Sequence, residues 1–252
     1  MVALEYQKAD QGYGIILINR PEKRNAISEE MIAMFRRCLK QARKDNIKFL
    51  VITSAGEKMF CSGGDLTYLH ANLGESEALE RLNPMKDVLY EIASFPVPVI
   101  GVLNGDALGG GCELATACDI RIAKESAKFG FVQSNLGILP GWGGGVLLYE
   151  KVHPTFALQW LMEGKVYDTH LLKDKGWINR IVAEHELEDY DKLLQSYISK
   201  NSRQMLLLKK QYIKNRKRNT LYGDMSAEVE QTASIWGSEE HKLAVGKFLA
   251  RK

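Results

Sequence analysis

The sequence lacks the features that mark a metal-bound, disulfide-stapled or membrane-spanning protein. It has four cysteines, none in a CxxC pair, and its five histidines form no ligand spacing, so no zinc site is expected. The longest apolar runs, such as Val97–Leu103, fall far short of the ~20 residues that span a bilayer. Residues 1–10 have no basic start followed by an apolar core, the pattern of a secretory signal. We therefore expect a cytoplasmic protein with free, buried thiols and no membrane partner.

The sequence also has little excess charge, because 34 Lys and Arg stand against 31 Asp and Glu, a net charge of +3. This balance gives no global reason to expect nucleic acid or an anionic membrane as the partner. Apolar residues make up 45% and charged residues 26%, which is ordinary for a globular protein and argues against disorder. At about 100–200 residues per domain, 252 residues make one large domain or two small ones.

Apolar patterning divides the chain into an alternating part and a helical part. Alternating or β-branched runs predict five strands, at 3–8, 13–19, 48–54, 97–103 and 119–123. Between them, helices are predicted after Ser28 and over 77–94, the second interrupted early by Pro84. From about residue 154 the pattern is helical, including 189–200, 203–217, 224–236 and 239–250. Strands alternating with helices, followed by helices alone, indicate an α/β core with a helical C-terminal part.

Two glycine-rich segments follow predicted strands, Phe60–Asp65 (FCSGGD) and Asn104–Glu113 (NGDALGGGCE). Consecutive glycines let a backbone N–H approach a ligand with no Cβ in the way. At the start of a helix such N–H groups also lack internal partners and carry partial positive charge. Two of these donors converging on one oxygen would form an oxyanion hole. Tight turns or close packing are the alternative explanation for both segments.

Neither glycine segment matches the common nucleotide-binding or hydrolase motifs. The second segment reads G-x-x-x-G-G-G rather than the G-x-G-x-x-G of a dinucleotide site. No G-x-x-x-x-G-K-[ST] or G-x-S-x-G occurs, which excludes a P-loop and the nucleophile elbow of α/β-hydrolases.

Glu113 adds an acid–base group to the second glycine segment. It lies three residues after Gly110, so on a helix beginning near Ala107 the two share a face. A carboxylate facing a polarised carbonyl can move a proton at the neighbouring carbon. Small and apolar neighbours predict partial burial and a raised pKa for Glu113. The alternative is an ordinary glutamate on the surface or near a helix N-terminus.

Several motifs together make the chain resemble the crotonase superfamily, which contains enoyl-CoA hydratases, isomerases and related acyl-CoA enzymes. The matching segments, in family order, are NRPEKRNA (19–26), FCSGGDL (60–66), PVPVI (96–100), GDALGGGCEL (105–114), CDI (118–120) and LGILP (136–140). Likeness is weaker over the helical C-terminal part. Independent motifs in the family's order are more specific than any one of them.

The resemblance implies a fold and an assembly. The fold is α/β, a crotonase-type spiral of repeated ββα units with a helical C-terminal region. The core with the acyl-CoA site would comprise residues 1–190, and residues 191–252 would pack on the core and on a neighbouring subunit. The implied assembly is a homotrimer, or a homohexamer made of two trimers.

The resemblance also implies roles for individual residues. The oxyanion-hole amides would be those of Gly64 and Gly110, holding the oxygen of a CoA thioester as an enolate develops. The lip that binds adenine and pantetheine would be formed by backbone near Ala26, Ser62, Asp65 and Leu66. Lys23 and Arg24 would reach CoA phosphates or remain solvated, and Asp65 has helix capping as its alternative role. Coenzyme A enters as part of the substrate, and no tightly bound cofactor is implied.

The chain departs from the family at residue 133. Family hydratases of the two-glutamate type carry a second acid twenty residues after the first, and here that residue is Gln133. A glutamine exchanges no proton at neutral pH, but it can orient water or a substrate carbonyl through hydrogen bonds. Double-bond isomerisation and two-carboxylate hydration are therefore not expected.

Two reactions remain compatible with Gln133. In the first, Glu113 alone hydrates an enoyl-CoA or dehydrates a hydroxyacyl-CoA. In the second, loss of a carboxylate from the acyl group generates the enolate, as in decarboxylases of the methylmalonyl- or ethylmalonyl-CoA type, which are similar around Gln133. Trp142 would narrow the acyl pocket or belong to the core. We favour the hydratase-like lyase, because Glu113 is retained in a setting that suits an acid.

A basic stretch leaves a third class of function open. Residues 203–218 contain seven Lys and Arg and no acidic residue. A basic amphipathic helix here would bind RNA or a membrane surface on a crotonase scaffold. A solvated outer face is the simpler interpretation, because Tyr212 alone within the stretch offers a ring for base stacking.

Overall fold

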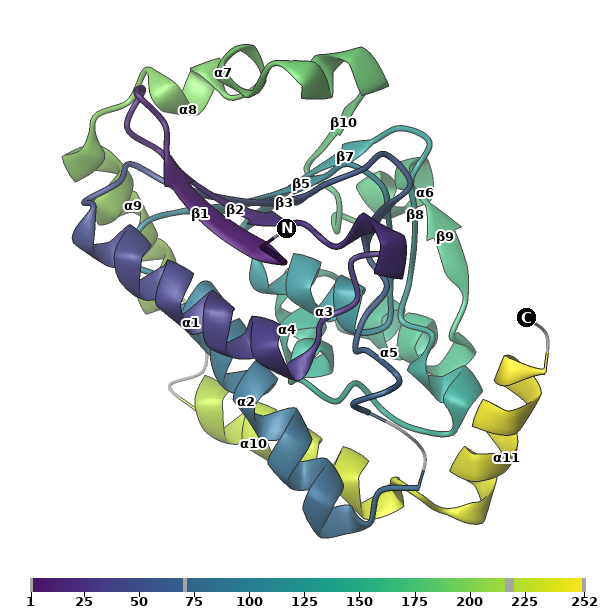
Figure 1. The fold of residues 1–252 in the computed structure, drawn as a ribbon. Coiled ribbons are helices and arrows are strands. Elements are labelled where there is room, and N and C mark those ends of the chain that lie inside the picture. Colours follow the sequence, from purple (N-terminus) through teal and green to yellow (C-terminus); the bar gives the residue numbers. More distant parts are fainter. Residues whose placement is uncertain (1, 70–71, 216–219, 251–252) are drawn as a thin grey trace.

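The computed structural model describes residues 2–69, 72–215 and 220–250. Six strands form the larger sheet in the order β1-β2-β3-β5-β7-β10 (Figure 1). Their bounds are Leu4–Lys8, Gly14–Ile18, Leu50–Ser54, Val99–Leu103, Ile120–Lys124 and Arg180–Val182. β1 pairs antiparallel with β2, and every other pair in this sheet is parallel. The five predicted strands are confirmed, with bounds that differ by one or two residues. β10 lies after residue 154, where helices alone were predicted, so that expectation is wrong there.

Four short strands form a second sheet in the order β4-β6-β8-β9. Their bounds are Met59–Cys61, Asp106–Leu108, Lys128–Gly130 and Val166–Asp168. β3, β5 and β7 of the large sheet are each followed by a strand of the small sheet and then by a helix. The chain therefore repeats a ββα unit three times, which confirms the predicted crotonase-type spiral.

Helices cover both faces of the large sheet (Figure 1). On one face lie α1 (Glu29–Lys44), α3 (Gly110–Ala117) and α4 (Gly144–Lys151). On the other lie two short helices, α7 (Tyr190–Leu193) and α8 (Gln195–Ile198), where one longer helix was expected. Side chains alternate between the faces, so Ile16, Leu50 and Ile52 join the main core. Ile15, Val51 and Val102 join a smaller core with Leu193, Leu194 and Met205.

The remaining helices belong to the core or to the C-terminal part. Their bounds are Glu75–Ala93 (α2), Pro154–Glu163 (α5), Thr169–Asp174 (α6), Ser202–Asn215 (α9), Leu221–Ile235 (α10) and Glu239–Leu249 (α11). Three 3-10 turns are η1 (Pro21–Lys23), η2 (Gln133–Leu136) and η3 (Glu184–Glu188). α2 continues through Pro84, so the predicted interruption is wrong.

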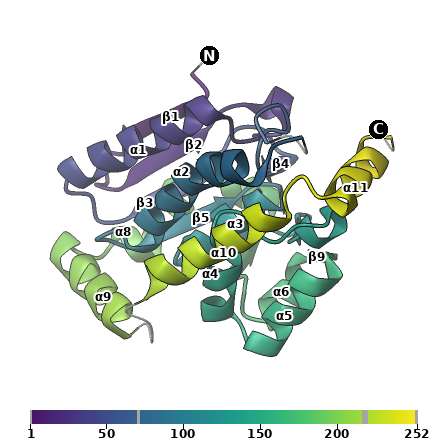
Figure 2. The same ribbon diagram turned by 90° about the horizontal axis from the view of Figure 1, so that it is seen from below.

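The C-terminal helices return to the core rather than extending from it. α10 packs along α2 and against α4, and α11 packs on η2 (Figure 2). Val229, Ala233 and Trp236 are buried. On α9, Met205 is buried, while Leu208 and Tyr212 are exposed. None of the helices in the described ranges is long and apolar enough to cross a membrane.

Candidate active site

The two glycine turns lie against each other because β4 and β6 pair in parallel. Gly63 follows β4 with φ +96°, and a Cβ on it would lie 3.0 Å from the amide nitrogen of Gly110. A Cβ on Gly111 would lie 1.9 Å from the carbonyl oxygen of Cys61. Side chains at these positions would separate the turns, so glycine is required for the close approach. The structure thus brings together two segments that are more than forty residues apart.

Gly64 and Gly110 both border the indole ring of Trp142. A Cβ on Gly64 would lie 3.4 Å from this ring, and one on Gly110 would lie 2.3 Å from it. Gly64 forms an isolated parallel bridge with Ile27, made by the neighbouring groups Gly63 O and Asp65 N, so its own N–H takes no part in the bridge. Gly110 is the first residue of α3, where an N–H has no intrahelical partner. Both amides are therefore suited to an external acceptor.

Glu113 is buried on α3, only 2% exposed, and its carboxylate accepts four hydrogen bonds. Gln133 Nε2 and the N–H of Gly141 donate to Oε1 at 2.9 and 3.2 Å. The N–H groups of Trp142 and Gly144 donate to Oε2, both at 2.9 Å. Four donors use the full acceptor capacity of a carboxylate, so Glu113 fixes the turn that precedes α4.

Opposing effects set the pKa of Glu113. Burial raises it, because the charged form loses its hydration, while the hydrogen bonds from Gly144, Trp142, Gly141 and Gln133 lower it. The balance is a raised pKa, as predicted from the small and apolar neighbours of Glu113 in the sequence. A raised pKa makes the carboxylate of Glu113 a stronger base than an ordinary glutamate.

Gln133 begins η2 and directs its amide toward Glu113. The side chain is 7% exposed, Nε2 donates to Glu113, and Oε1 has no hydrogen-bond partner among the described residues. A buried amide oxygen without a partner is uncommon, because leaving it unsatisfied costs about 1–3 kcal/mol. Gln133 lines a cavity, where water or a ligand could donate the missing hydrogen bond to Oε1.

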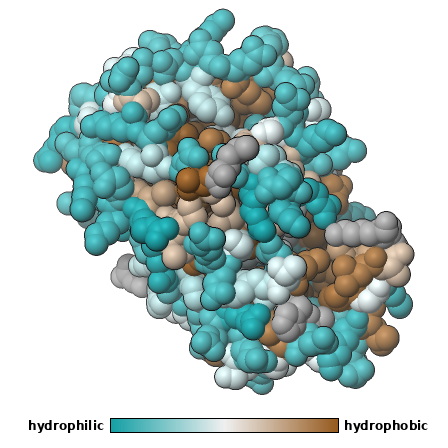
Figure 3. Space-filling view, viewed as in Figure 1, coloured by the Kyte–Doolittle hydropathy of each residue, from teal (hydrophilic) through white to brown (hydrophobic). Residues whose placement is uncertain are grey.

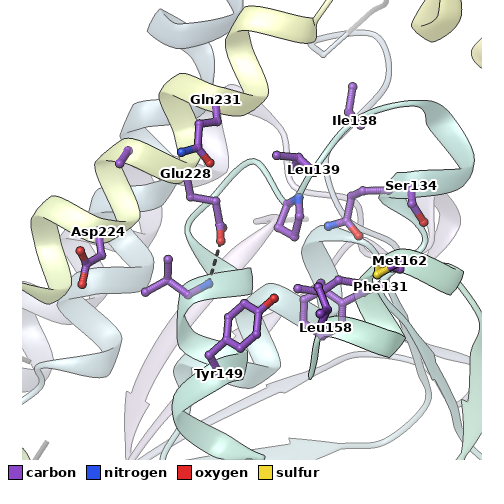
Figure 4. Close-up of a pocket in the computed structure, with 15 residues that line it drawn as sticks. Phe131, Ser134, Ile138, Leu139, Tyr149, Leu158, Met162, Asp224, Glu228 and Gln231 are labelled. Atoms are coloured by element: carbon purple, nitrogen blue, oxygen red, sulfur yellow. Dashed lines mark hydrogen bonds between the residues drawn. The ribbon is translucent and has the colours of Figure 1, made fainter. Parts of the chain in front are cut away.

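This cavity has a volume of about 610 Å³. Its walls come mainly from the loop around η2, from α4 and α5, and from α10. Figure 4 shows Glu228 and Gln231 of α10 on one side and Ser134 and Met162 on the other. Most of the lining is apolar and includes Phe131, Ile138, Leu139, Val146, Leu158, Leu161 and Met162. The polar groups are few, and two of them are the carboxylates of Asp224 and Glu228.

Glu228 is the ionisable residue near the site that the sequence interpretation missed. Its carboxylate accepts hydrogen bonds from Gly145 N at 3.1 Å and Val146 N at 2.7 Å, at the start of α4 (Figure 4). Burial and then the charge of Glu113 raise the pKa of Glu228 to about 8. One signal was present in the sequence, because Glu228 shares a helix face with the buried Met225, Val229 and Thr232.

The residues of the predicted coenzyme A lip also lie together. Ser62 N donates to Arg24 O at 3.1 Å, and Asp65 N donates to Ile27 O at 2.9 Å, so segments 24–27 and 62–65 run side by side. Ala26 is buried, whereas Lys23, Arg24 and Leu66 are exposed. The structure therefore gathers the predicted lip residues, while their contact with coenzyme A stays a prediction.

Arg20 holds residues of this lip together. The sequence motifs alone did not indicate this role. Its Nη1 donates to Asp65 Oδ2 at 2.8 Å and to Ala26 O at 3.1 Å. The other oxygen of Asp65 accepts from the backbone and hydroxyl of Thr67, which lies outside any helix. Asp65 thus holds two loops together rather than capping a helix.

The basic stretch contains one structural lysine. Lys209 on α9 is buried and donates to Asp119 Oδ2 and, at 3.2 Å, to Ala93 O. Lys210 and Lys214 are exposed, and residues 216–218 of the stretch lie outside the described residues. RNA or surface binding by this stretch stays a hypothesis.

The part of the chain that the structure describes contains no set of side chains placed to bind a metal ion. No group of three or more His, Cys, Asp or Glu side chains there is placed to hold an ion. All four cysteines are free thiols, of which Cys61, Cys112 and Cys118 are buried and Cys38 is half-buried.

Solved structures with the same architecture define the class of protein. Enoyl-CoA hydratase from Bacillus halodurans superposes with a TM-score of 0.86 at 23% identity, covering 98% of this chain and 100% of that one. Enoyl-CoA hydratase from Bacillus anthracis gives a TM-score of 0.80 at 26% identity, covering 100% and 97%. The fold is therefore that of the crotonase superfamily.

Sequence comparison gives the family. A model described as enoyl-CoA hydratase/isomerase matches residues 8–252. Crotonyl-CoA hydratase of Syntrophomonas wolfei is 30% identical over 244 residues, which cover 96% of this chain and 94% of that protein. Mitochondrial methylglutaconyl-CoA hydratase of Mus musculus is 33% identical over 184 residues, which cover 73% of this chain but 58% of that protein. The chain belongs to the enoyl-CoA hydratase/isomerase family and is an enzyme of that family.

Proposed function

We propose that this enzyme hydrates a short enoyl-CoA, or dehydrates the matching 3-hydroxyacyl-CoA, with Glu113 as its one acid–base group. The observation that carries the proposal is the buried Glu113–Gln133 pair, joined by a 2.9 Å hydrogen bond close to the paired glycine turns. The crotonyl-CoA hydratase relative, which aligns over nearly the whole chain, supports the same reaction class. The substrate carries its own coenzyme A, so no tightly bound cofactor is needed.

In this mechanism the amides of Gly64 and Gly110 donate to the thioester oxygen. The unpaired Oε1 of Gln133 accepts a hydrogen bond from the attacking water and orients it toward Cβ. Glu113 takes a proton from the water, the new C–O bond forms at Cβ, and the displaced electron pair moves onto the thioester oxygen as an enolate. Glu113 then returns the proton to Cα, so that water has been added and the enzyme is regenerated.

Glu113 must exchange one of its four hydrogen bonds to act as a base. The bond from Gly141 N is the longest, at 3.2 Å, and is the one we expect to yield first. Its loss exposes one lone pair of Oε1 on the side where Gln133 is also bound. The remaining three donors keep the carboxylate in place during proton transfer.

The cavity beside Gln133 favours hydration over decarboxylation. A decarboxylase must bind a substrate carboxylate, which needs a cation or several N–H donors when buried. The described lining residues include the carboxylates of Asp224 and Glu228 and no Lys, Arg or His. Gln133 Nε2 is already committed to Glu113. A substrate carboxylate in this cavity would meet the charge of Asp224 and no cation among the described lining residues, whereas an apolar acyl group would meet apolar walls.

Separate incubations with crotonyl-CoA and methylmalonyl-CoA test the proposal. We expect loss of the enoyl absorbance of crotonyl-CoA and formation of 3-hydroxybutyryl-CoA, with no CO₂ released from methylmalonyl-CoA. Release of CO₂ with the enoyl absorbance unchanged would establish decarboxylation instead.

We further propose that the enzyme assembles as a homotrimer or a pair of trimers through an apolar face on α5 and α11, which both pack on η2. In Figure 3 apolar side chains gather at the lower right, where Figure 1 shows α11. The exposed apolar residues of this face are Leu158 and Met162, which also border the cavity, and Leu243, Phe248 and Leu249. A second copy of the chain would cover them, because monomeric proteins rarely leave large apolar patches in water.

A further inference from the structure

The turn before α4 and the first residues of that helix offer their backbone N–H groups to two carboxyl groups. Gly141, Trp142 and Gly144 donate to Glu113 of α3, and Gly145 and Val146 donate to Glu228 of α10. Five amides within six residues are thus divided between two acids from distant parts of the chain. Only Glu113 entered the mechanism above.

Space at this turn is as restricted as its hydrogen bonding. A Cβ on Gly144 would lie 2.3 Å from Glu113 Cγ, and a Cβ on Gly145 would lie 2.4 Å from Glu228 Oε2. The two glycines allow both carboxyl groups to approach adjacent residues of one helix start. Helix N-termini carry a partial positive charge that favours a nearby anion. Two full negative charges at one such terminus would repel each other.

We propose that Glu228 is a positioning residue for Glu113, and that the two carboxyl groups act as one pair that shares a single negative charge across the turn from Gly141 to Val146. Glu113 is the ionised member, since three of these amides and the side chain of Gln133 donate to its carboxylate, whereas Glu228 accepts hydrogen bonds from backbone amides alone. Glu228 carries the proton of the pair. Its hydrogen bonds with Gly145 and Val146 hold the start of α4 in place. Only the catalytic consequence of this inference rests on the proposed function.

Other charged groups around Glu228 do not alter this assignment. From α4, Tyr149 lines the same cavity, and burial followed by the negative charge of Glu228 raises the pKa of its phenol. From α10 itself, Asp224 lies one turn earlier and adds negative charge to the same wall. From α2, Lys86 binds Ser226, and Asp87 binds Tyr222. Ser226 lies two residues before Glu228 and therefore on a nearly opposite side of α10.

The catalytic consequence is a dependence on the proton of Glu228. When Glu228 loses it, near pH 8, a second negative charge stands at the turn beside the site. That charge opposes the negative enolate, so we expect kcat to fall several-fold above this pH. A glutamine at position 228 would imitate the protonated carboxyl and remove the fall.

The test compares the wild-type protein with Glu228→Gln and Glu230→Gln, a matched exchange at an exposed position of the same helix. For crotonyl-CoA hydration we expect wild type and Glu230→Gln to lose kcat above about pH 8, while Glu228→Gln stays level with an unchanged KM. A fall in all three proteins, or a uniform loss in Glu228→Gln at every pH, would overturn the proposal.

Infrared spectra of buried, protonated carboxyl groups give a readout that needs no activity. The carboxyl band lost near pH 8 in wild type should be absent from Glu228→Gln and present in Glu230→Gln. In Glu113→Gln the same band should disappear at a lower pH, because the charge of Glu113 is gone; this holds even if Glu228→Gln fails to fold. A band that is unmoved in Glu113→Gln would refute the shared charge. Absence of hydration by wild type would instead reject the proposed function.

Discussion

The chemistry of this enzyme depends on the surroundings of individual residues, and Glu113 is the clearest case. A carboxylate that accepts several backbone N–H bonds usually becomes a weak base, with a pKa well below its ordinary value. Burial works in the opposite direction, and for Glu113 it prevails. The same group is therefore held rigidly by four donors and remains able to exchange a proton.

Glu228 makes the stability of the folded protein depend on pH. Its pKa is raised from 4.5 to about 8, so between these values the folded chain binds more protons than the unfolded chain. The free energy of unfolding contributed by this group is therefore lost as the pH rises from 4.5 toward 8. Urea unfolding across this range should show a decline that is smaller in Glu228→Gln. An equal decline in both proteins would contradict the raised pKa.

Sequence identified Glu113 and Gln133 as a pair, yet their contact depends on the fold. The spacing of twenty residues came with a family resemblance, whereas the hydrogen bond requires β7 and β8 to return the chain to α3. Glu228 could not be assigned in the same way. It lies more than a hundred residues after Glu113, and only the packing of α10 on α4 brings the two acids to one turn.

At the scale of elements, packing overrides local preference in α2. Proline inside a helix costs about 3 kcal/mol, since it removes a hydrogen bond and crowds the preceding turn. α2 nevertheless continues through Pro84, because Leu82, Met85 and Val88 are buried against neighbouring helices. Five strands of the large sheet were predictable because each has five residues with an alternating or β-branched pattern, whereas β10 has three and was not predicted. β4, β6 and β8 have three residues each, too few for a pattern.

The loop after β2 is joined to the turn after β4 by Arg20, and this joint can be tested. Arg20→Ala removes the bonds to Asp65 and Ala26 O, so we expect the proposed lip to lose its shape. KM for crotonyl-CoA should rise about tenfold, equivalent to about 1.4 kcal/mol, with kcat little changed. Arg36→Ala, which removes an ion pair between α1 and α2, is the control. An unchanged KM in Arg20→Ala would argue against the lip.

α9 is attached to the core by the buried ion pair of Lys209 and Asp119. Removing one partner leaves an uncompensated buried charge, so Lys209→Met should lower the free energy of unfolding by about 3–5 kcal/mol. Lys210→Met, at the neighbouring exposed position, should change it by less than about 0.5 kcal/mol. Denaturant titration of both variants measures the difference. Similar stabilities would mean that Lys209 is not a structural residue.

The whole molecule combines a core built on two sheets with an apolar outer face on α5 and α11. Met162 is 70% exposed and Leu243 is 63% exposed, on helices that both pack on η2. η2 carries Gln133, so contacts between subunits at this face would also steady the site. The predicted boundary at residue 190 between the core and the C-terminal region remains a prediction. α10 of the C-terminal region packs against α2 and α4 of the core.

Assembly through this face can be tested with one charge. Met162→Lys should dissociate the oligomer, because an interface cannot easily bury an unpaired ammonium group. Leu208→Lys on α9, which Figure 1 shows far from α11, should leave the mass unchanged. Light scattering coupled to size exclusion measures both. A monomeric wild type, or an intact Met162→Lys oligomer, would refute the proposed face.

The proposed hydration requires Glu113 to move a proton from water to Cα. Incubation of crotonyl-CoA in D₂O, followed by NMR of the product, observes that transfer directly. Wild-type protein should give 3-hydroxybutyryl-CoA with one deuterium at Cα, and Glu113→Gln should be slower by about 10²–10⁴-fold. Hydration that continues at the wild-type rate in Glu113→Gln would contradict the account.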